Sequence, residues 1–197
     1  MASPPMRVGI FLFDEVEVLD FAGPFEVFSI AGRRDNLEPF EVFTVAERPE
    51  PVLARNGLSI NPRYTFADCP PPDILVVPGG FGTRREMKNP AVVTWVRTTS
   101  WASQITFSVC TGSLVLAMAG LLEGLEATTH HLALDELKAV APNTRVQPDQ
   151  KVVDTGRIVT SGGISAGING ALSLVARLMG EEYAVEAARY MEYDWIR

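Results

Sequence analysis

The sequence predicts an α/β protein, a three-layer sandwich in which helices cover both faces of a flavodoxin-like, doubly wound, mostly parallel sheet. Three observations support this fold class. Short continuous apolar runs alternate with stretches of helical periodicity. Turn residues end the runs, as at Pro78-Gly79-Gly80. One run leads straight into a cysteine and a helix, as in a nucleophile elbow. With 197 residues, we expect a single domain spanning 1–197.

The chain opens with a strand and a crossover helix. Arg7 to Phe13 is a continuous apolar run of strand length. After it, Gly23, Pro24 and Glu26 have the types expected of a helix cap, a first-turn proline and an acid in the first turn. The pattern therefore predicts a helix that begins near Gly23 and ends near Gly32.

Two further strands and a hairpin follow. Phe40 to Ala46 is rich in β-formers and predicts the second strand. Pro51 to Phe66 contains Asn56-Gly57 between strand-like pieces, which predicts an inserted hairpin. Asp73 to Val77 then predicts the third strand.

The second half continues the alternation. Pro90 to Ala102 has helical spacing, Ile105 to Val109 predicts the fourth strand, and Thr111 to Leu122 predicts the next helix. The remaining predictions are β segments at Ala127 to His130, Val152-Val153 and Arg157 to Thr160, and helices at Leu132 to Val140, Ile164 to Met179 and Glu181 to Tyr193.

The amino-acid composition indicates which binding partners and which cellular compartment to expect. The chain has 24 acidic and 17 basic residues, a net charge of -7, and no cluster of Lys and Arg, which argues against nucleic acid and anionic membranes as partners. Asp14 and Glu15 interrupt the first apolar run, so no export leader is expected. Two cysteines are too few for a disulfide scaffold. We expect a cytoplasmic protein with reduced thiols.

Cys110 is the candidate nucleophile. It stands where a strand ends and a helix begins, so its thiol would face the free N–H groups of the helix, which favour a thiolate. Gly112 permits a tight turn, and Thr111 offers a backbone N–H beside the sulfur. The alternative is a buried cysteine that only fills space.

Gly79 and Gly80 follow the third strand and reach the same edge of the sheet. Their unhindered N–H groups would suit an oxyanion hole. The alternative is an ordinary turn at the end of a strand.

Asp20 follows the first strand and is the candidate acid/base, because the carboxyl ends of parallel strands share one edge. Beside a thiol, the carboxyl group is expected to share one proton with it and to titrate with it as a pair. The alternative is that Asp20 caps the following helix.

His130 and His131 are the only histidines. On a strand they would point to opposite faces, so at most one reaches the site, and we take His130 as a candidate substrate-binding residue. Without acids or cysteines at ligand spacing, no metal is predicted. Cys69 is expected to be a buried loop residue.

The segments DILVVPGG, SVCTGSLVLAMAGLLEG and ATTHH together resemble the ThiJ/PfpI branch of the class I glutamine amidotransferase-like superfamily, over nearly the whole chain. The segment LDFAGPFEVF and the CTG elbow are similar in particular to bacterial isonitrile hydratases and to the sensor domains of some AraC-like regulators.

The resemblance implies specific roles. Cys110 would be the nucleophile, Asp20 its acid/base partner and Thr111 a further functional residue, with Gly80 supplying an oxyanion N–H. It also implies a homodimer, a small-molecule substrate and no cofactor. The implied activity is a lyase reaction in which water adds to an isonitrile to give an N-substituted formamide.

The sequence departs from the family pattern at two positions, and two alternative functions remain open. Protease-like and deglycase-like branches have His after the nucleophile, where this chain has Thr111, and Glu where it has Asp20. A glyoxalase, deglycase or hydrolase is one alternative, and a non-catalytic sensing domain is the other. Sensor domains normally continue into a DNA-binding region, and no basic recognition helix is visible before Arg197, so we expect an enzyme.

Overall fold

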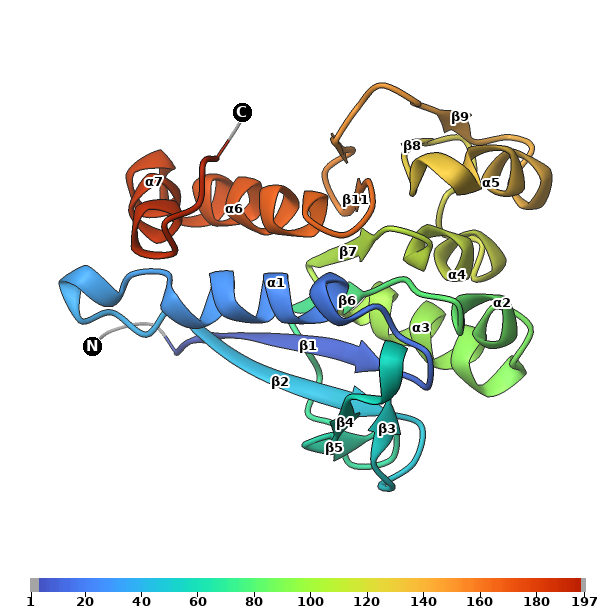
Figure 1. Ribbon diagram of the computed structural model, residues 1–197, viewed down its shortest axis with the longest axis horizontal. Helices are drawn as coiled ribbons and strands as arrows, with labels where there is room; N and C mark the ends of the chain where they lie inside the picture. Colours follow the sequence, from blue (N-terminus) through green and yellow to red (C-terminus); the bar gives the residue numbers. More distant parts are fainter. Residues whose placement is uncertain (1–3, 196–197) are drawn as a thin grey trace.

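A computed structural model describes residues 4–195, which are arranged around a seven-stranded sheet (Figure 1). Its order is β10-β11-β7-β6-β1-β2-β5, and every neighbouring pair is parallel except β10 with β11. The strands are β1 Met6–Leu12, β2 Phe40–Ala46, β5 Tyr64–Thr65, β6 Ile74–Val77, β7 Ile105–Val109, β10 Val152–Asp154 and β11 Ile158–Ser161. Without its edge strands β5 and β10, the sheet has the 2-1-3-4-5 order of flavodoxin-like folds, as predicted.

Helices cover both faces of the sheet (Figure 1). They are α1 Val18–Ile30, α2 Thr83–Glu86, α3 Pro90–Ala102, α4 Gly112–Met118, α5 Leu134–Val140, α6 Ala166–Met179 and α7 Glu181–Tyr190. Successive residues of a strand point to opposite faces. In β7, Phe107 contacts Gly170 of α6, whereas Thr106 donates a hydrogen bond to Ser100 of α3 at 2.7 Å. Helices α6 and α3 therefore lie on opposite sides.

The central strands are buried because both faces are covered. Every residue of β6 and β7 is buried, as are the last five residues of β1. This burial explains why β6 and the last five residues of β1 appear in the sequence as unbroken apolar runs, whereas β7 also buries Thr106 and Ser108. Their carboxyl ends lie at one edge of the sheet.

The predicted hairpin is present. Strands β3 (Val52–Leu53) and β4 (Ser59–Ile60) pair antiparallel, and between them Asn56 and Gly57 have φ of 59° and 83°. Asparagine and glycine tolerate this left-handed region best, so the Asn-Gly signal is confirmed.

Two loops at the sheet edge pair through their backbones. Val16 and Gly80 form an isolated β-bridge, and Glu17 N–H donates to the carbonyl of Gly79 at 2.9 Å. This pairing ends the extended segment after β1 at residue 17, and α1 begins at the next residue. The predicted start near Gly23 was therefore wrong by five residues, and Pro24 lies inside the helix.

The segment after α4 also differs from the prediction. The expected strand Ala127 to His130 is reduced to β8 (Glu126–Ala127), which pairs with the unpredicted β9 (Arg145–Val146). At Thr128 the backbone N–H bonds instead to the hydroxyl of Thr160, at 2.8 Å. This side-chain bond takes the place of further strand pairing.

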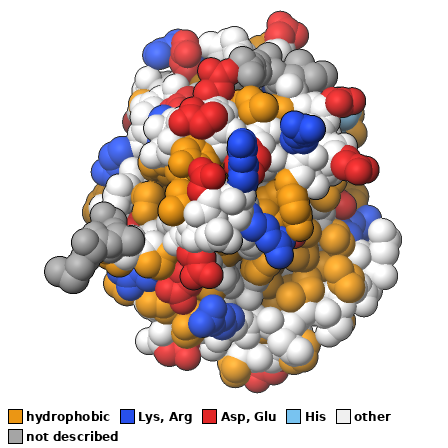
Figure 2. All heavy atoms as spheres, turned by 90° about the vertical axis from the view of Figure 1, so that its left-hand side faces the viewer, with side chains coloured by type: hydrophobic (Ala, Val, Ile, Leu, Met, Phe, Trp, Pro, Cys, Tyr) orange, Lys and Arg blue, Asp and Glu red, His pale blue; other side chains and the backbone are white. Residues whose placement is uncertain are grey.

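Charges are mixed on the face that Figure 2 shows, where acidic and basic side chains are interspersed with hydrophobic ones. Within residues 4–195, no helix combines the length and the apolar character needed to cross a membrane.

Candidate active site

Cys110 lies at a sharp elbow between β7 and α4. It has a positive φ of 56°, which is uncommon for a residue with a side chain, and its N–H donates to the carbonyls of Ser161 and Gly162, both at 3.1 Å. A β-carbon on Gly112 would lie 2.0 Å from the carbonyl oxygen of Val77, so only glycine fits there. The elbow directs the thiol toward the carboxyl edge of the sheet.

Asp20 reaches this elbow from the first turn of α1. Its fully buried carboxylate accepts hydrogen bonds from the N–H groups of Gly79 and Ile164, each at 3.0 Å, and from the thiol of Cys110. The helix cap is Glu17, whose side chain makes no capping bond. Asp20 therefore does not cap α1, and its carboxylate connects three loops of the sheet edge.

Burial dominates the protonation of both groups. It raises the pKa of Asp20 to about 7, although the hydrogen bond from Cys110 acts in the opposite direction. Burial and the neighbouring Asp20 raise the pKa of the Cys110 thiol to about 12, against the lowering effect of the Thr111 N–H. The expectation of a favoured thiolate was therefore wrong, because one backbone N–H does not offset burial beside a carboxylate. The raised pKa of Cys110 favours the neutral thiol.

The predicted oxyanion donors are engaged with side chains. Gly79 N–H binds Asp20, and Gly80 N–H donates to the hydroxyl oxygen of Thr111 at 3.0 Å. A β-carbon on Gly79 would lie 2.6 Å from the nitrogen of Thr111 and 2.8 Å from Asp20 Oδ2. The two glycines thus permit close packing and orient both side chains beside the sulfur.

Thr83 is a member of this network that sequence reasoning missed. Its buried hydroxyl donates to the carbonyl of Gly80 at 2.6 Å and lies 3.0 Å from the hydroxyl oxygen of Thr111. Thr83 begins the short, unpredicted helix α2. Because a lone threonine after a glycine turn has no distinctive pattern, nothing in the sequence marks it.

A cavity of about 250 Å³ opens beside the thiol. Its lining residues are Glu17, Gly80, Phe81, Arg84, Cys110, Thr111, His130, Leu132, Ala133 and Ile164. Exposed apolar side chains, among them Phe81 and Leu132, stand at its rim. A small, largely apolar molecule could therefore lie in this cavity beside the Cys110 sulfur.

His130 reaches the cavity, although not from a strand. It caps a 3-10 turn at His131–Ala133, and the two imidazole rings lie side by side with centroids 4.4 Å apart. The expectation of opposite faces was therefore wrong, because the backbone turns at this point. His130 Nδ1 accepts the N–H of Leu132 at 3.2 Å, so in the neutral ring the proton resides on Nε2. Burial lowers the pKa of His130, which favours this neutral form.

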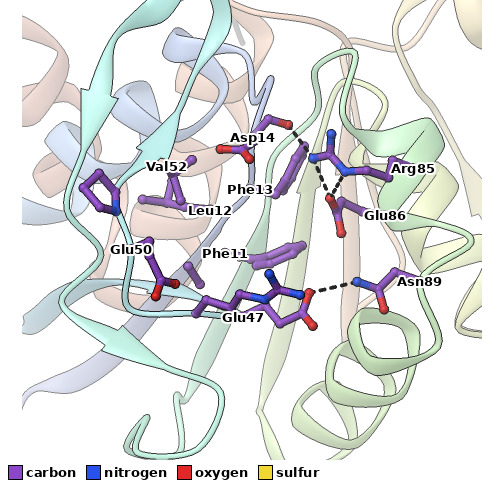
Figure 3. Close-up of a pocket in the computed structure, with 13 residues that line it drawn as sticks. Phe11, Leu12, Phe13, Asp14, Glu47, Glu50, Val52, Arg85, Glu86 and Asn89 are labelled. Carbon is purple, nitrogen blue, oxygen red and sulfur yellow. Dashed lines mark hydrogen bonds and ion pairs between the residues drawn. The ribbon is translucent and has the colours of Figure 1, made fainter.

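A second, larger cavity of about 440 Å³ lies at the ends of β1 and β2 (Figure 3). Cys110 is not among its lining residues. Four of its charged and amide groups pair with one another, Arg85 with Glu86 at 2.7 Å and Asn89 with Glu47 at 2.9 Å (Figure 3). Cys69 is half-buried and adjoins neither cavity. Among the described residues, no group of three His, Cys, Asp or Glu side chains could hold a metal.

The fold and the site together define a class of protein, in which a parallel α/β sheet carries a cysteine elbow with a buried carboxyl partner. Within this class the chain belongs to the DJ-1/PfpI family, whose model matches residues 6–177.

Relatives of different kinds share this domain. The chain is 37% identical over 191 residues to the isonitrile hydratase of Pseudomonas putida, covering 95% of this chain and 78% of the relative. It is 35% identical over 147 residues to the HTH-type transcriptional regulator CdhR of Pseudomonas aeruginosa, covering 75% of this chain and 43% of the regulator. A solved THiJ/PfpI family protein from Pseudomonas syringae superimposes with a TM-score of 0.86 at 30% identity, covering 98% of this chain and 77% of that one.

Proposed function

We propose that the protein is a cysteine-dependent hydratase that adds water to an isonitrile and releases an N-substituted formamide. The observation that carries the proposal is the Cys110 thiol, hydrogen-bonded to the carboxylate of Asp20 beside a small cavity. The residue after the nucleophile is Thr111, so the site lacks the adjacent Cys-His pair of the protease-like branches. The similarity to an isonitrile hydratase over 95% of the chain supports the same assignment.

In the first half of the reaction, Asp20 carries a proton from the Cys110 thiol to the substrate. Asp20 takes the proton of the thiol as sulfur bonds to the terminal carbon of the isonitrile. The carboxyl group then returns that proton to the same carbon. The product is a thioimidate, in which the former isonitrile carbon carries one hydrogen, the sulfur and a double bond to nitrogen.

The second half releases the formamide. Water adds to the thioimidate carbon while the nitrogen gains a proton, which gives a tetrahedral intermediate. As this intermediate collapses, the ionised Asp20 carboxylate takes the hydroxyl proton, the carbonyl forms and the sulfur is expelled. Asp20 then passes that proton to the sulfur. The net change is the addition of one water to the isonitrile, and the enzyme returns to its starting protonation.

Two neighbouring groups complete the scheme. The Thr111 hydroxyl accepts from the N–H of Gly80 and donates to the carbonyl of Gly80 at 3.2 Å, so it would turn its proton from that carbonyl to the substrate nitrogen. His130, held as the Nε2–H tautomer, is a second donor on the cavity wall. Gly79, Gly80 and Gly112 act by allowing the close approach of these groups.

The decisive experiment is to incubate the purified chain with a simple alkyl isonitrile and to measure the N-alkyl formamide by mass spectrometry. We expect turnover that is lost in C110S and retained in C69S, the matched control at the other cysteine. Parallel assays with methylglyoxal and with esters test the glyoxalase, deglycase and hydrolase alternatives. Formamide production by C110S, or turnover of the carbonyl panel alone, would refute the proposal.

A sensing role is the second candidate, because a transcriptional regulator shares 35% identity over 147 residues. In that case an isonitrile or another small molecule would bind beside Cys110 without being converted. Calorimetric binding that is unaccompanied by formamide would favour sensing over catalysis.

Assembly, cofactor use and location are proposed on the family resemblance. We expect a homodimer, which light scattering after size exclusion would reveal, and activity that survives chelators because neither a metal nor a cofactor is required. A cytoplasmic location follows from the same reasoning and is testable by cell fractionation.

A further inference from the structure

The ionisable groups on the wall of the Cys110 cavity leave one charge without a partner. Arg84 is bound by Glu136 through two hydrogen bonds, one of them from Nε at 3.2 Å, so this pair is neutral overall. The lowered pKa of His130 favours its uncharged form. The carboxylate of Glu17 makes no hydrogen bond or ion pair with any residue within 4–195.

The negative charge of Glu17 acts on both sides of the cavity. After burial, which is the main cause, it contributes to the raised pKa of Asp20. It also opposes the lowering of the pKa of His130, of which burial is again the main cause and to which His131 and Arg84 contribute. Any substituent that enters the cavity therefore lies in the field of this carboxylate, close to a second carboxyl group at Asp20.

We propose that Glu17 sets the charge selectivity of the site, which admits isonitriles with uncharged or cationic substituents and rejects those that carry a carboxylate. This inference rests on the proposed hydratase function for its substrate class. Two like charges a few ångströms apart near a protein surface repel strongly enough to lower the rate at least about tenfold. The rim at Phe81 and Leu132 is apolar, and Arg84, the cation on the cavity wall, is already engaged by Glu136.

The first test compares two isonitriles of matched length, one ending in a carboxylate and the other in the corresponding amide. We expect wild-type kcat/KM to be at least about tenfold lower for the carboxylate, and E17Q to reduce the difference to about two- or threefold. The control is E26Q, because Glu26 is an exposed carboxylate on α1 that does not line the cavity. Equal discrimination by wild type and E17Q would overturn the inference.

The second test does not depend on turnover. In a C69S background, Cys110 is alkylated with neutral iodoacetamide or anionic iodoacetate, and the ratio of the two rates is taken. The ratio cancels the fraction of thiolate, so a change in thiol pKa does not affect it. We expect E17Q to shift the ratio several-fold toward iodoacetate, and 1 M salt to reduce the shift.

The two tests distinguish failure of the proposed hydratase function from failure of the proposed role of Glu17. If no isonitrile is hydrated but the alkylation ratio shifts in E17Q, the hydratase proposal fails and the role of Glu17 in charge selection stands. If isonitriles are hydrated and the ratio is the same in wild type, E17Q and E26Q, the role of Glu17 is refuted while the hydratase function stands.

Discussion

The imidazole ring of His130 lies directly against the backbone of Gly163, where a β-carbon would stand 2.1 Å from Cδ2 of the ring. At the adjacent Gly162 a β-carbon would meet its nearest neighbour at an ordinary 3.5 Å. Two neighbouring glycines thus differ sharply in how much room they leave.

We predict that G163A displaces the His130 ring from the cavity and lowers kcat/KM by about tenfold or more, with a loss of about 1–3 kcal/mol in the free energy of unfolding. G162A, the matched control, should keep activity within about twofold of wild type. Steady-state kinetics and urea denaturation of both variants provide the measurement. Equal activities in the two variants would show that the position of the ring does not matter.

We predict that Asp20 sets the pH dependence of the proposed reaction. Because the carboxylate must be ionised to accept the thiol proton, kcat/KM should rise as pH increases through about 7, where Asp20 loses its proton, and stay level above it. D20N should lower turnover by at least about a hundredfold and remove this rise, with circular dichroism unchanged. A profile that is flat in wild type between pH 5 and 9 would exclude Asp20 as the base.

The raised pKa of Asp20 should also make the free energy of unfolding fall as pH rises. The pKa of Asp20 in the folded protein lies above its unfolded value of 3.8. Its contribution to the free energy of unfolding is therefore fully present below pH about 4 and is lost as pH rises through about 7. A shift of about three units corresponds to about 4 kcal/mol. Wild type should therefore lose more free energy of unfolding than D20N between pH 4 and 8.

D20N should also be less stable than wild type for a reason that does not depend on pH. It has one acceptor oxygen for the N–H groups of Gly79 and Ile164, so D20N should be destabilised by about 1–3 kcal/mol at low pH. Urea denaturation of both proteins across the pH range is the measurement. A difference in free energy that does not change with pH would mean that Asp20 is not perturbed by burial.

Thr83 should act as a positioning residue for Thr111. T83V removes the hydroxyl that binds the carbonyl of Gly80 and contacts the Thr111 oxygen, so we predict a fall in kcat of about tenfold with little change in KM. T83S retains the hydroxyl and should recover most of the activity. If T83V keeps the activity of wild type, or if T83S is as impaired as T83V, the loss does not follow the hydroxyl and the positioning role is refuted.

The sheet and the elbow could be predicted because their signals are local. Continuous apolar runs located β1 and β6 to within a residue or two, since strands buried on both faces contain few polar residues, and short segments rich in β-forming residues located β2 and β7. Cys110 was expected at an elbow because it follows such a run and precedes a glycine.

Other features depend on tertiary contacts and left no local signal. The start of α1 is set by the bridge between Val16 and Gly80, so the Gly-Pro pair at 23–24 was misleading. The neutral state of the Cys110 thiol results from burial beside Asp20, which sequence spacing does not report.

The bridge between Val16 and Gly80 has a consequence for how such a site can be altered. One of the two joined loops precedes α1, which carries Asp20, and the other contains Gly79, whose N–H binds the Asp20 carboxylate. The spacing of the strands therefore fixes the distance between this carboxylate and the Cys110 sulfur. Changes of side chain around the cavity can retune specificity without disturbing this separation. Widening the site would require the two loops to be uncoupled, and this would disturb the alignment on which the proposed proton transfer depends.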